Sequence, residues 1–279
     1  MTYKKYGEVF KELRQQHNLT LEDFKKIGIS KSTISQFENG KSLLSFDKLD
    51  MALQEMNVMM SAYILIINDG ESEYFLDQFE EIDYARLQGD EAKLKNIYKR
   101  NLKYETKVGL QIGIAAKAGY EDLDIKSLRS IEEYFEKCVF WTRFDLFLLV
   151  HTADQISNQL LLSVVERFFV DNSSYLIQRQ DFKHLVSRII FKAIMILIKT
   201  QKLDQAKYMI SRFSDIIFEF DLAEKIILMF SGGCWVYSFE SKKSGKRILN
   251  RCFRILTDIN SINVRKMLKI EFENLTKEK

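Results

Sequence analysis

The chain contains no proline. Its 279 residues include only 11 glycines, whereas leucine, isoleucine, phenylalanine, lysine and glutamate are plentiful. Proline interrupts the interior of a helix and glycine weakens it, so a long chain that lacks the first and has little of the second favours helical structure. This length accommodates one large domain or two ordinary ones, and we expect two. The composition therefore predicts an all-α protein.

The N-terminal part of the chain has the pattern of a helix-turn-helix. Apolar residues at helical spacing over 6–13 predict a first helix, and Thr20 predicts the start of a second helix of two turns. Gly28 supplies a turn, and Ser30 is placed to cap a third helix that Gly40 ends. Two short helices joined by a glycine-containing turn are typical of this motif.

Two further helices are expected before a polar stretch of the sequence. One follows a cap at Ser45, and a fifth covers about 59–67. The polar stretch 68–72 then separates this unit from the rest. We therefore expect a five-helix DNA-binding domain over 1–68 and a second domain over 69–279.

The second domain is predicted to be helical throughout. Amphipathic helices of roughly 12–20 residues follow one another, separated by short polar breaks. These breaks lie at about 89–90, 122–124, 173–174, 202–204 and 241–245. The segments 89–93 and 203–207 open their helices similarly, as tetratricopeptide-like hairpins do, which favours an α-solenoid. The pair Gly232-Gly233 predicts a kink or a close contact between helices.

The third predicted helix has an outward face that is polar but hardly charged. Ile34 and Phe37 point to one side, and the other side carries four polar residues. These are Ser32, Ser35, Gln36 and Asn39. Short hydroxyls and a glutamine can approach base edges, glutamine through paired hydrogen bonds to adenine. The alternative is an ordinary solvated face.

Two lysines and one ion pair complete the predicted DNA-binding site. Lys31 lies near the N-terminal end of the third helix, where it can meet a base or a phosphate, and Lys41 is a candidate phosphate contact. Glu38 lies toward the inward flank of this helix, and Arg14 ends the core face of the first. We therefore expect a structural ion pair between Arg14 and Glu38.

These segments resemble a known class of regulators. Residues 8–14, 19–21 and 29–40 are similar to the Cro/C1 (XRE) helix-turn-helix family, and the long helical tail with Trp141 in segment 140–147 resembles the Rgg/MutR/GadR transcriptional regulators. The resemblance implies base contacts by Lys31, Ser32 and Gln36 and phosphate contacts near Asn39 and Lys41. It also implies a tetratricopeptide-like solenoid that dimerises through its last helices and binds a short, often hydrophobic, signalling peptide on its concave face.

A candidate effector site lies on the strongly apolar helix near 179–199. Its basic residues are Arg179, Lys183, Arg188 and Lys192. A cation beside apolar surface suits a peptide carboxylate. The alternative is that these groups form a solvated face over a core helix.

The sequence offers little support for enzyme chemistry. His17, His151 and His184 lie in separate helical patterns, and we find neither a Cys/His cluster with metal-ligand spacing nor a phosphate loop, a nucleophile elbow or a dinucleotide fingerprint. We expect no catalytic residues, metal or cofactor. Three widely spaced cysteines, Cys138, Cys234 and Cys252, are expected to be small buried hydrophobes in a reducing compartment. With neither a secretion signal nor a spanning helix expected, the prediction is cytoplasmic.

Three functions remain open at this level. The first is a homodimeric transcription factor that binds a pseudo-palindromic operator, contacts RNA polymerase and is switched by a ligand in its second domain. The second is a protein-interaction scaffold, which the net charge of only +3 and the uncharged helix face leave open. The third is an antitoxin or phage-type repressor that works without a ligand.

Overall fold

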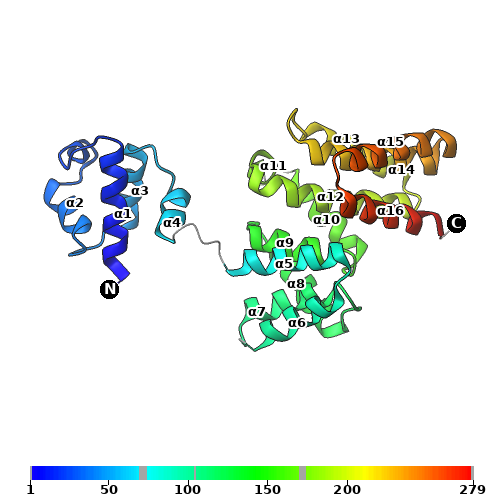
Figure 1. The fold of residues 1–279 in the computed structure, drawn as a ribbon, viewed down its shortest axis with the longest axis horizontal. Coiled ribbons are helices and arrows are strands. Elements are labelled where there is room, and N and C mark those ends of the chain that lie inside the picture. Colours follow the sequence, from blue (N-terminus) through cyan, green and yellow to red (C-terminus); the bar gives the residue numbers. More distant parts are fainter. Residues whose placement is uncertain (1, 69–73, 104, 170–173, 278–279) are drawn as a thin grey trace. The chain divides into compact units, whose positions relative to one another are not determined.

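The chain is helical wherever the structure describes it. The computed structural model covers residues 2–68, 74–103, 105–169 and 174–277, and over these ranges it contains no strand, so the predicted all-α class is confirmed (Figure 1). The chain divides into two compact units, Met1–Tyr74 and Phe75–Lys279. The sequence-based boundary at 68 lies six residues before that division, and 69–73 fall outside the described residues.

The N-terminal unit contains four α-helices and one 3-10 helix among its described residues. They are α1 (Thr2–Gln16), η1 (Asp23–Ile27), α2 (Lys31–Glu38), α3 (Phe46–Glu55) and α4 (Met60–Ile67). The predicted second α-helix is wrong in type, because it is a single 3-10 segment. The backbone N–H and the hydroxyl of Thr20 both donate to the Asp23 carboxylate, at 2.6 and 2.8 Å, and Gly28 ends the segment at φ 79°. Local contacts therefore fix both ends of the segment, and between them the chain forms a 3-10 helix over Asp23–Ile27.

Three phenylalanine rings form the centre of the N-terminal unit. Phe10 of α1 lies 5.7 Å from Phe24 and 5.3 Å from Phe37, centroid to centroid, and all three are buried. The Tyr63 hydroxyl donates to the Tyr6 carbonyl at 2.6 Å and thereby fixes α4 to α1. These contacts hold the helices that support α2 in a rigid frame.

The C-terminal unit is an array of helices that pack largely as neighbouring pairs (Figure 1). Their bounds are α5 (Tyr74–Gln88), α6 (Glu91–Leu102), α7 (Lys107–Lys117), α8 (Ile125–Lys137), α9 (Arg143–Thr152), α10 (Asn158–Phe168), α11 (Ser174–Gln178), α12 (Gln180–Lys199), α13 (Leu203–Asp215), α14 (Leu222–Phe239), α15 (Lys242–Asp258) and α16 (Ile262–Lys277). Helix α6 packs on α7, α12 on α13 and α14 on α15, as in stacked hairpins. The predicted breaks at 89–90 and 122–124 fall between helices.

Of the two stretches that contain glycine, 241–245 departs from the prediction and Gly232-Gly233 agrees with one of its two alternatives. Helix α15 begins at Lys242, so Gly245 lies inside it and not in a loop. A Cβ on Gly245 would lie 2.5 Å from the Tyr237 backbone, so the glycine permits close packing of α14 on α15. Helix α14 runs through Gly232 without a break, and a Cβ on Gly233 would approach Leu249 to 3.0 Å. Close contact between helices, one of the two expectations, is what the structure shows.

Two of the three cysteines and Trp141 lie in the core of this unit. Cys234 and Cys252 are buried, whereas Cys138 is half-buried and to that extent departs from the prediction. Trp141 packs between Phe135 and Phe168, at 5.9 and 5.3 Å between ring centroids. No helix among the described residues is long and apolar enough to cross a membrane.

Candidate functional site

The predicted ion pair beneath α2 is present in the structure. Arg14 Nε donates to Glu38 Oε1 at 2.6 Å, Arg14 Nη2 donates to Glu38 Oε2 at 2.9 Å, and Arg14 Nη1 donates to the Leu19 carbonyl at 2.7 Å. The hydrogen bonds to Glu38 raise the pKa of Arg14 above its ordinary value, against the effect of burial. The pair therefore joins α1, the segment before η1 and α2 into one body.

Helix α2 presents a polar surface on the side away from this pair. Ile34 and Phe37 are buried, while Ser32 and Gln36 are exposed. The Ser30 hydroxyl accepts a hydrogen bond from the Thr33 backbone at 3.2 Å, so Ser30 caps the helix as the sequence predicts. Among the described residues the Gln36 side chain makes no hydrogen bond, which leaves its amide free to meet a partner.

Three of the predicted DNA-contact residues border one shallow depression in this surface. They are Lys31, Ser32 and Ser35, and the other lining residues are Leu21, Glu22, Lys25 and Ser30. The Ser32 hydroxyl lies 2.9 Å from that of Ser30, and Lys31 Nζ lies 3.4 Å from Glu22 Oε1. We call Lys31, Ser32, Ser35 and Gln36 the reading face.

The last two predicted contacts lie at the C-terminal end of α2. Asn39 donates its side-chain amide to the Ser35 carbonyl at 2.7 Å, so one of its amide hydrogens is already used in ending the helix. Lys41 follows in the turn and is exposed. The geometry thus leaves Lys41 available for a phosphate and gives Asn39 a structural role as well.

A second polar cluster surrounds a cavity of about 300 Å³ in the C-terminal unit. Helices α5, α9, α12, α14 and α16 all line it. Its charged lining residues are Asp83, Arg86, Asp154, Arg188, Lys192, Lys266 and Glu271, and the apolar ones include Leu87, Val150, Phe191, Ile227 and Ile270. We call this cavity the ion-pair pocket.

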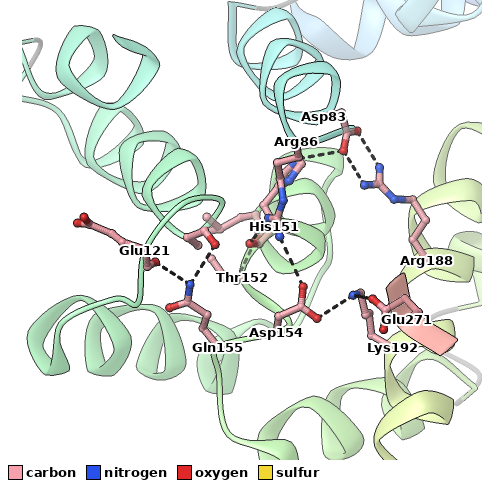
Figure 2. Close-up of polar contacts among 12 residues, drawn as sticks. Asp83, Arg86, Glu121, His151, Thr152, Asp154, Gln155, Arg188, Lys192 and Glu271 are labelled. Atoms are coloured by element: carbon pink, nitrogen blue, oxygen red, sulfur yellow. Dashed lines mark hydrogen bonds and ion pairs between the residues drawn. The ribbon is translucent and has the colours of Figure 1, made fainter. Parts of the chain in front are cut away.

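The charges of the ion-pair pocket are arranged in specific pairs (Figure 2). Arg188 holds both oxygens of Asp83, at 2.5 and 2.7 Å. Lys192 Nζ lies between Asp154 Oδ1 at 2.8 Å and Glu271 Oε1 at 2.6 Å. Burial opposes ionisation of Asp83 and Asp154, but the neighbouring cations hold the pKa of each carboxyl below its ordinary value. Both acids are therefore ionised and fix the cations in place.

His151 is the buried neutral member of this cluster. Its ring stacks on Phe79 at 5.6 Å and 4°, and Nε2 lies 3.6 Å from Asp83 Oδ1, beyond hydrogen-bond distance. Burial lowers the pKa of His151 to about 3. With one uncharged imidazole, four cations and three acids, the lining carries a net positive charge that suits a carboxylate group.

The structure divides the predicted effector residues between two places. Arg188 and Lys192 line the ion-pair pocket, whereas Arg179 and Lys183 do not. Arg179 is the N-cap residue of α12, and Lys183 is buried against Asp221 at 2.8 Å. Carboxylates hold Lys183, Arg188 and Lys192, so these three cations are not an ordinary solvated face.

Six polar residues of the pocket were missed by the sequence reasoning. They are Asp83, Arg86, His151, Asp154, Lys266 and Glu271. A signal was available for two of them, because His151 and Asp154 follow the apolar run 146–150 of a helix. The other four come from α5 and α16, whose proximity depends on the tertiary fold. Among the described residues no group of three or more histidine, cysteine or acidic side chains could hold a metal ion.

Comparison with protein-family models gives two matches. Residues 85–269 match the C-terminal domain of the HTH-type transcriptional regulator Rgg, and residues 10–58 match a helix-turn-helix model. The chain belongs to the Rgg family. This is a family of transcriptional regulators and not of enzymes, as the sequence predicts.

Solved structures with the same fold include pheromone receptors. The Streptococcus dysgalactiae SHP pheromone receptor Rgg2 has a TM-score of 0.76 at 16% identity, covering 96% of this chain and 99% of that chain. A putative transcriptional regulator from Listeria monocytogenes EGD-e has a TM-score of 0.77 at 14% identity over 99% and 98%. A bacterial peptide pheromone/receptor complex has a TM-score of 0.66 at 16% identity over 98% and 98%. These likenesses show a shared fold along almost the entire chain.

A curated relative matches a shorter stretch. Antitoxin PezA of Streptococcus pneumoniae serotype 4 (strain ATCC BAA-334 / TIGR4) is 29% identical over 110 residues, which is 38% of this chain. The match spans 65% of the length of PezA.

Proposed function

We propose that this Rgg-family protein binds operator DNA through the reading face and that a short peptide in the ion-pair pocket controls this binding. The observation that carries the first part is the exposed Gln36 amide, which has no hydrogen-bond partner among the described residues and lies on a helix fixed by the buried Arg14–Glu38 pair. A reading residue must be free, and its helix must be rigid, for base contacts to discriminate. Lys31 and Ser32 extend the same surface, and Lys41 adds a phosphate contact.

The protein acts as a homodimer in this proposal. One helix-turn-helix unit presents too small a surface for strong specific binding, whereas two units placed about one helical turn apart read a pseudo-palindrome. Contact with RNA polymerase and a cytoplasmic location complete the proposal. Multi-angle light scattering of the full chain tests the dimer, and a stable monomer at micromolar concentration contradicts it.

The peptide part of the proposal rests on the ion-pair pocket. Its lining combines apolar side chains with Arg188 and Lys192, which suits a hydrophobic peptide that ends in a carboxylate. Two of the structural neighbours are described as a pheromone receptor and a pheromone/receptor complex. Peptide binding acts on DNA only if the peptide binds two conformations of the protein unequally.

DNA binding is tested with duplexes selected from a random pool by the full chain. We expect Gln36→Ala to weaken the selected duplex by roughly tenfold and to relax preference at one or two base pairs, because a two-bond amide contact discriminates by about 1–3 kcal/mol. Lys41→Ala should weaken all duplexes alike and reduce the salt dependence. If selection enriches no sequence and neither variant changes binding, the protein is not a sequence-specific regulator.

Peptide control is tested with synthetic peptides encoded by short reading frames beside the gene. A peptide that binds should raise the thermal stability of the full chain and change its affinity for the selected duplex. Lys192→Met should remove both effects, because it deletes the cation proposed to meet the carboxylate. DNA binding that no such peptide changes would favour a repressor that works without a ligand.

A further inference from the structure

The depression beside the reading face contains a carboxylate where an approaching DNA would place negative charge. Glu22 precedes η1 and lines the same depression as Lys31, Ser32 and Ser35. Its side chain is 59% exposed, and Oε1 lies 3.4 Å from Lys31 Nζ, whose side chain is 60% exposed. An acid in this place weakens attraction to phosphates, so its presence needs an explanation.

The contacts open to Lys31 differ in free energy: those with a carboxylate or a phosphate are weak, and the one with a base edge is stronger. An exposed lysine–carboxylate pair contributes at most about 1 kcal/mol, and a single phosphate contact in water is of similar size. A two-acceptor contact with the O6 and N7 atoms of guanine contributes about 1–3 kcal/mol of discrimination. Lys31 therefore leaves Glu22 with a clear gain only where the DNA offers the right base edge.

We propose that Glu22 is a specificity-determining residue that withholds Lys31 from the phosphates of unrelated DNA. On DNA of mixed sequence Lys31 stays paired with Glu22, so the protein makes one phosphate contact fewer than it would without Glu22. On the operator Lys31 has already left Glu22 for a base edge. The inference rests on the proposed DNA-binding function and assigns to Glu22 a role in selectivity that does not require Glu22 to touch a base.

The salt dependence of binding distinguishes this role from a general effect of charge. In Glu22→Gln we expect affinity for a mixed-sequence duplex to rise about threefold to tenfold at low salt, with a slope of log K against log salt steeper by about 0.9, because one more lysine now releases a counterion. For the selected duplex we expect a rise of about twofold and an unchanged slope. The ratio of the two affinities therefore falls.

Two control variants make the test decisive. Glu12→Gln removes the same charge from an exposed position on α1 and should leave the slope for mixed-sequence DNA unchanged. In a Lys31→Ala background Glu22→Gln should have no effect on that slope. Circular dichroism on each full-chain variant checks that the helices are retained.

The possible outcomes separate the proposals. The proposal that Glu22 withholds Lys31 is wrong if Glu22→Gln leaves the affinity and salt dependence for mixed-sequence DNA unchanged. It is also wrong if the effect of Glu22→Gln persists in the Lys31→Ala background, and Glu22 then at most repels phosphates directly. If the unsubstituted chain binds selected and mixed-sequence duplexes equally, the proposed DNA-reading function fails, while the mixed-sequence slopes still report on the Glu22–Lys31 pair.

Discussion

Arg14 and Glu38 lie 24 positions apart in the sequence and face each other through two parallel hydrogen bonds in the core of the N-terminal unit. Each residue is less than 9% exposed. Because a buried charge without its partner is costly, the pair fixes the distance between α1 and α2 more strictly than apolar packing alone.

Removing one partner of this pair should destabilise the N-terminal unit. We expect Glu38→Gln to lower its free energy of unfolding by about 3 kcal/mol, since the Arg14 guanidinium remains buried without an anion. Hydrogen exchange of the α1 and α2 amides in the full chain measures the loss. The double variant Arg14→Met with Glu38→Leu should recover much of it, and a double variant less stable than Glu38→Gln would show that the pair itself stabilises the unit.

One glycine of α14 and one of α15 provide a second, internally controlled prediction. A Cβ on Gly232 meets nothing within 4 Å, so Gly232→Ala should stabilise the C-terminal unit by about 0.5–1 kcal/mol through helix propensity. Gly245→Ala should destabilise it by several kcal/mol, because its Cβ would lie 2.5 Å from the backbone of Tyr237. Urea unfolding of the full chain measures both changes. Equal effects of the two substitutions would contradict the close packing of α14 on α15.

The sequence was most informative where the constraint is local. Ser30, the turn at Gly28 and the apolar positions Ile34 and Phe37 each act within a few residues, so the third helix and its outward face could be predicted. The Arg14–Glu38 pair was accessible because both residues border predicted apolar faces. The 3-10 form of η1 was missed because the two Thr20–Asp23 hydrogen bonds resemble a capping box, which normally begins an α-helix.

The ion-pair pocket was only partly predictable for a different reason. Arg188 and Lys192 could be singled out from the sequence because they are cations in an apolar helix. Their partners Asp83 and Glu271, however, lie 105 and 79 positions away in the sequence. No periodicity in the sequence brings α5 and α16 to α12. Lys183, like Arg188, is a cation in the same apolar helix, yet it pairs with Asp221 and does not line the pocket.

Glu271 joins the C-terminal helix α16 to Lys192 of the ion-pair pocket. We expect Glu271→Gln to accelerate hydrogen exchange in α16 by about tenfold, because Lys192 keeps Asp154 and loses its 2.6 Å bond to α16. Glu273→Gln, an exposed position on the same helix, is the matched control. Exchange rates that rise equally in both variants would show that Glu271 does not anchor the helix.

The buried neutral His151 predicts how stability changes with pH. Its pKa in the folded protein is about 3, below the ordinary 6.5, because burial disfavours the imidazolium. Above pH 6.5 the ring is neutral in both states and contributes no pH dependence. As the pH falls from 6.5 toward 3, the unfolded chain binds a proton that the folded chain does not, so stability falls by about 1.4 kcal/mol per pH unit from this residue. His151→Phe keeps an aromatic ring to stack on Phe79 and should remove that part of the slope, as measured by urea unfolding at pH 7, 6 and 5. Parallel pH profiles for the parent and His151→Phe would mean that His151 has the same pKa in the folded and unfolded chain, so that below about pH 6.5 the pocket carries one more positive charge than its geometry indicates.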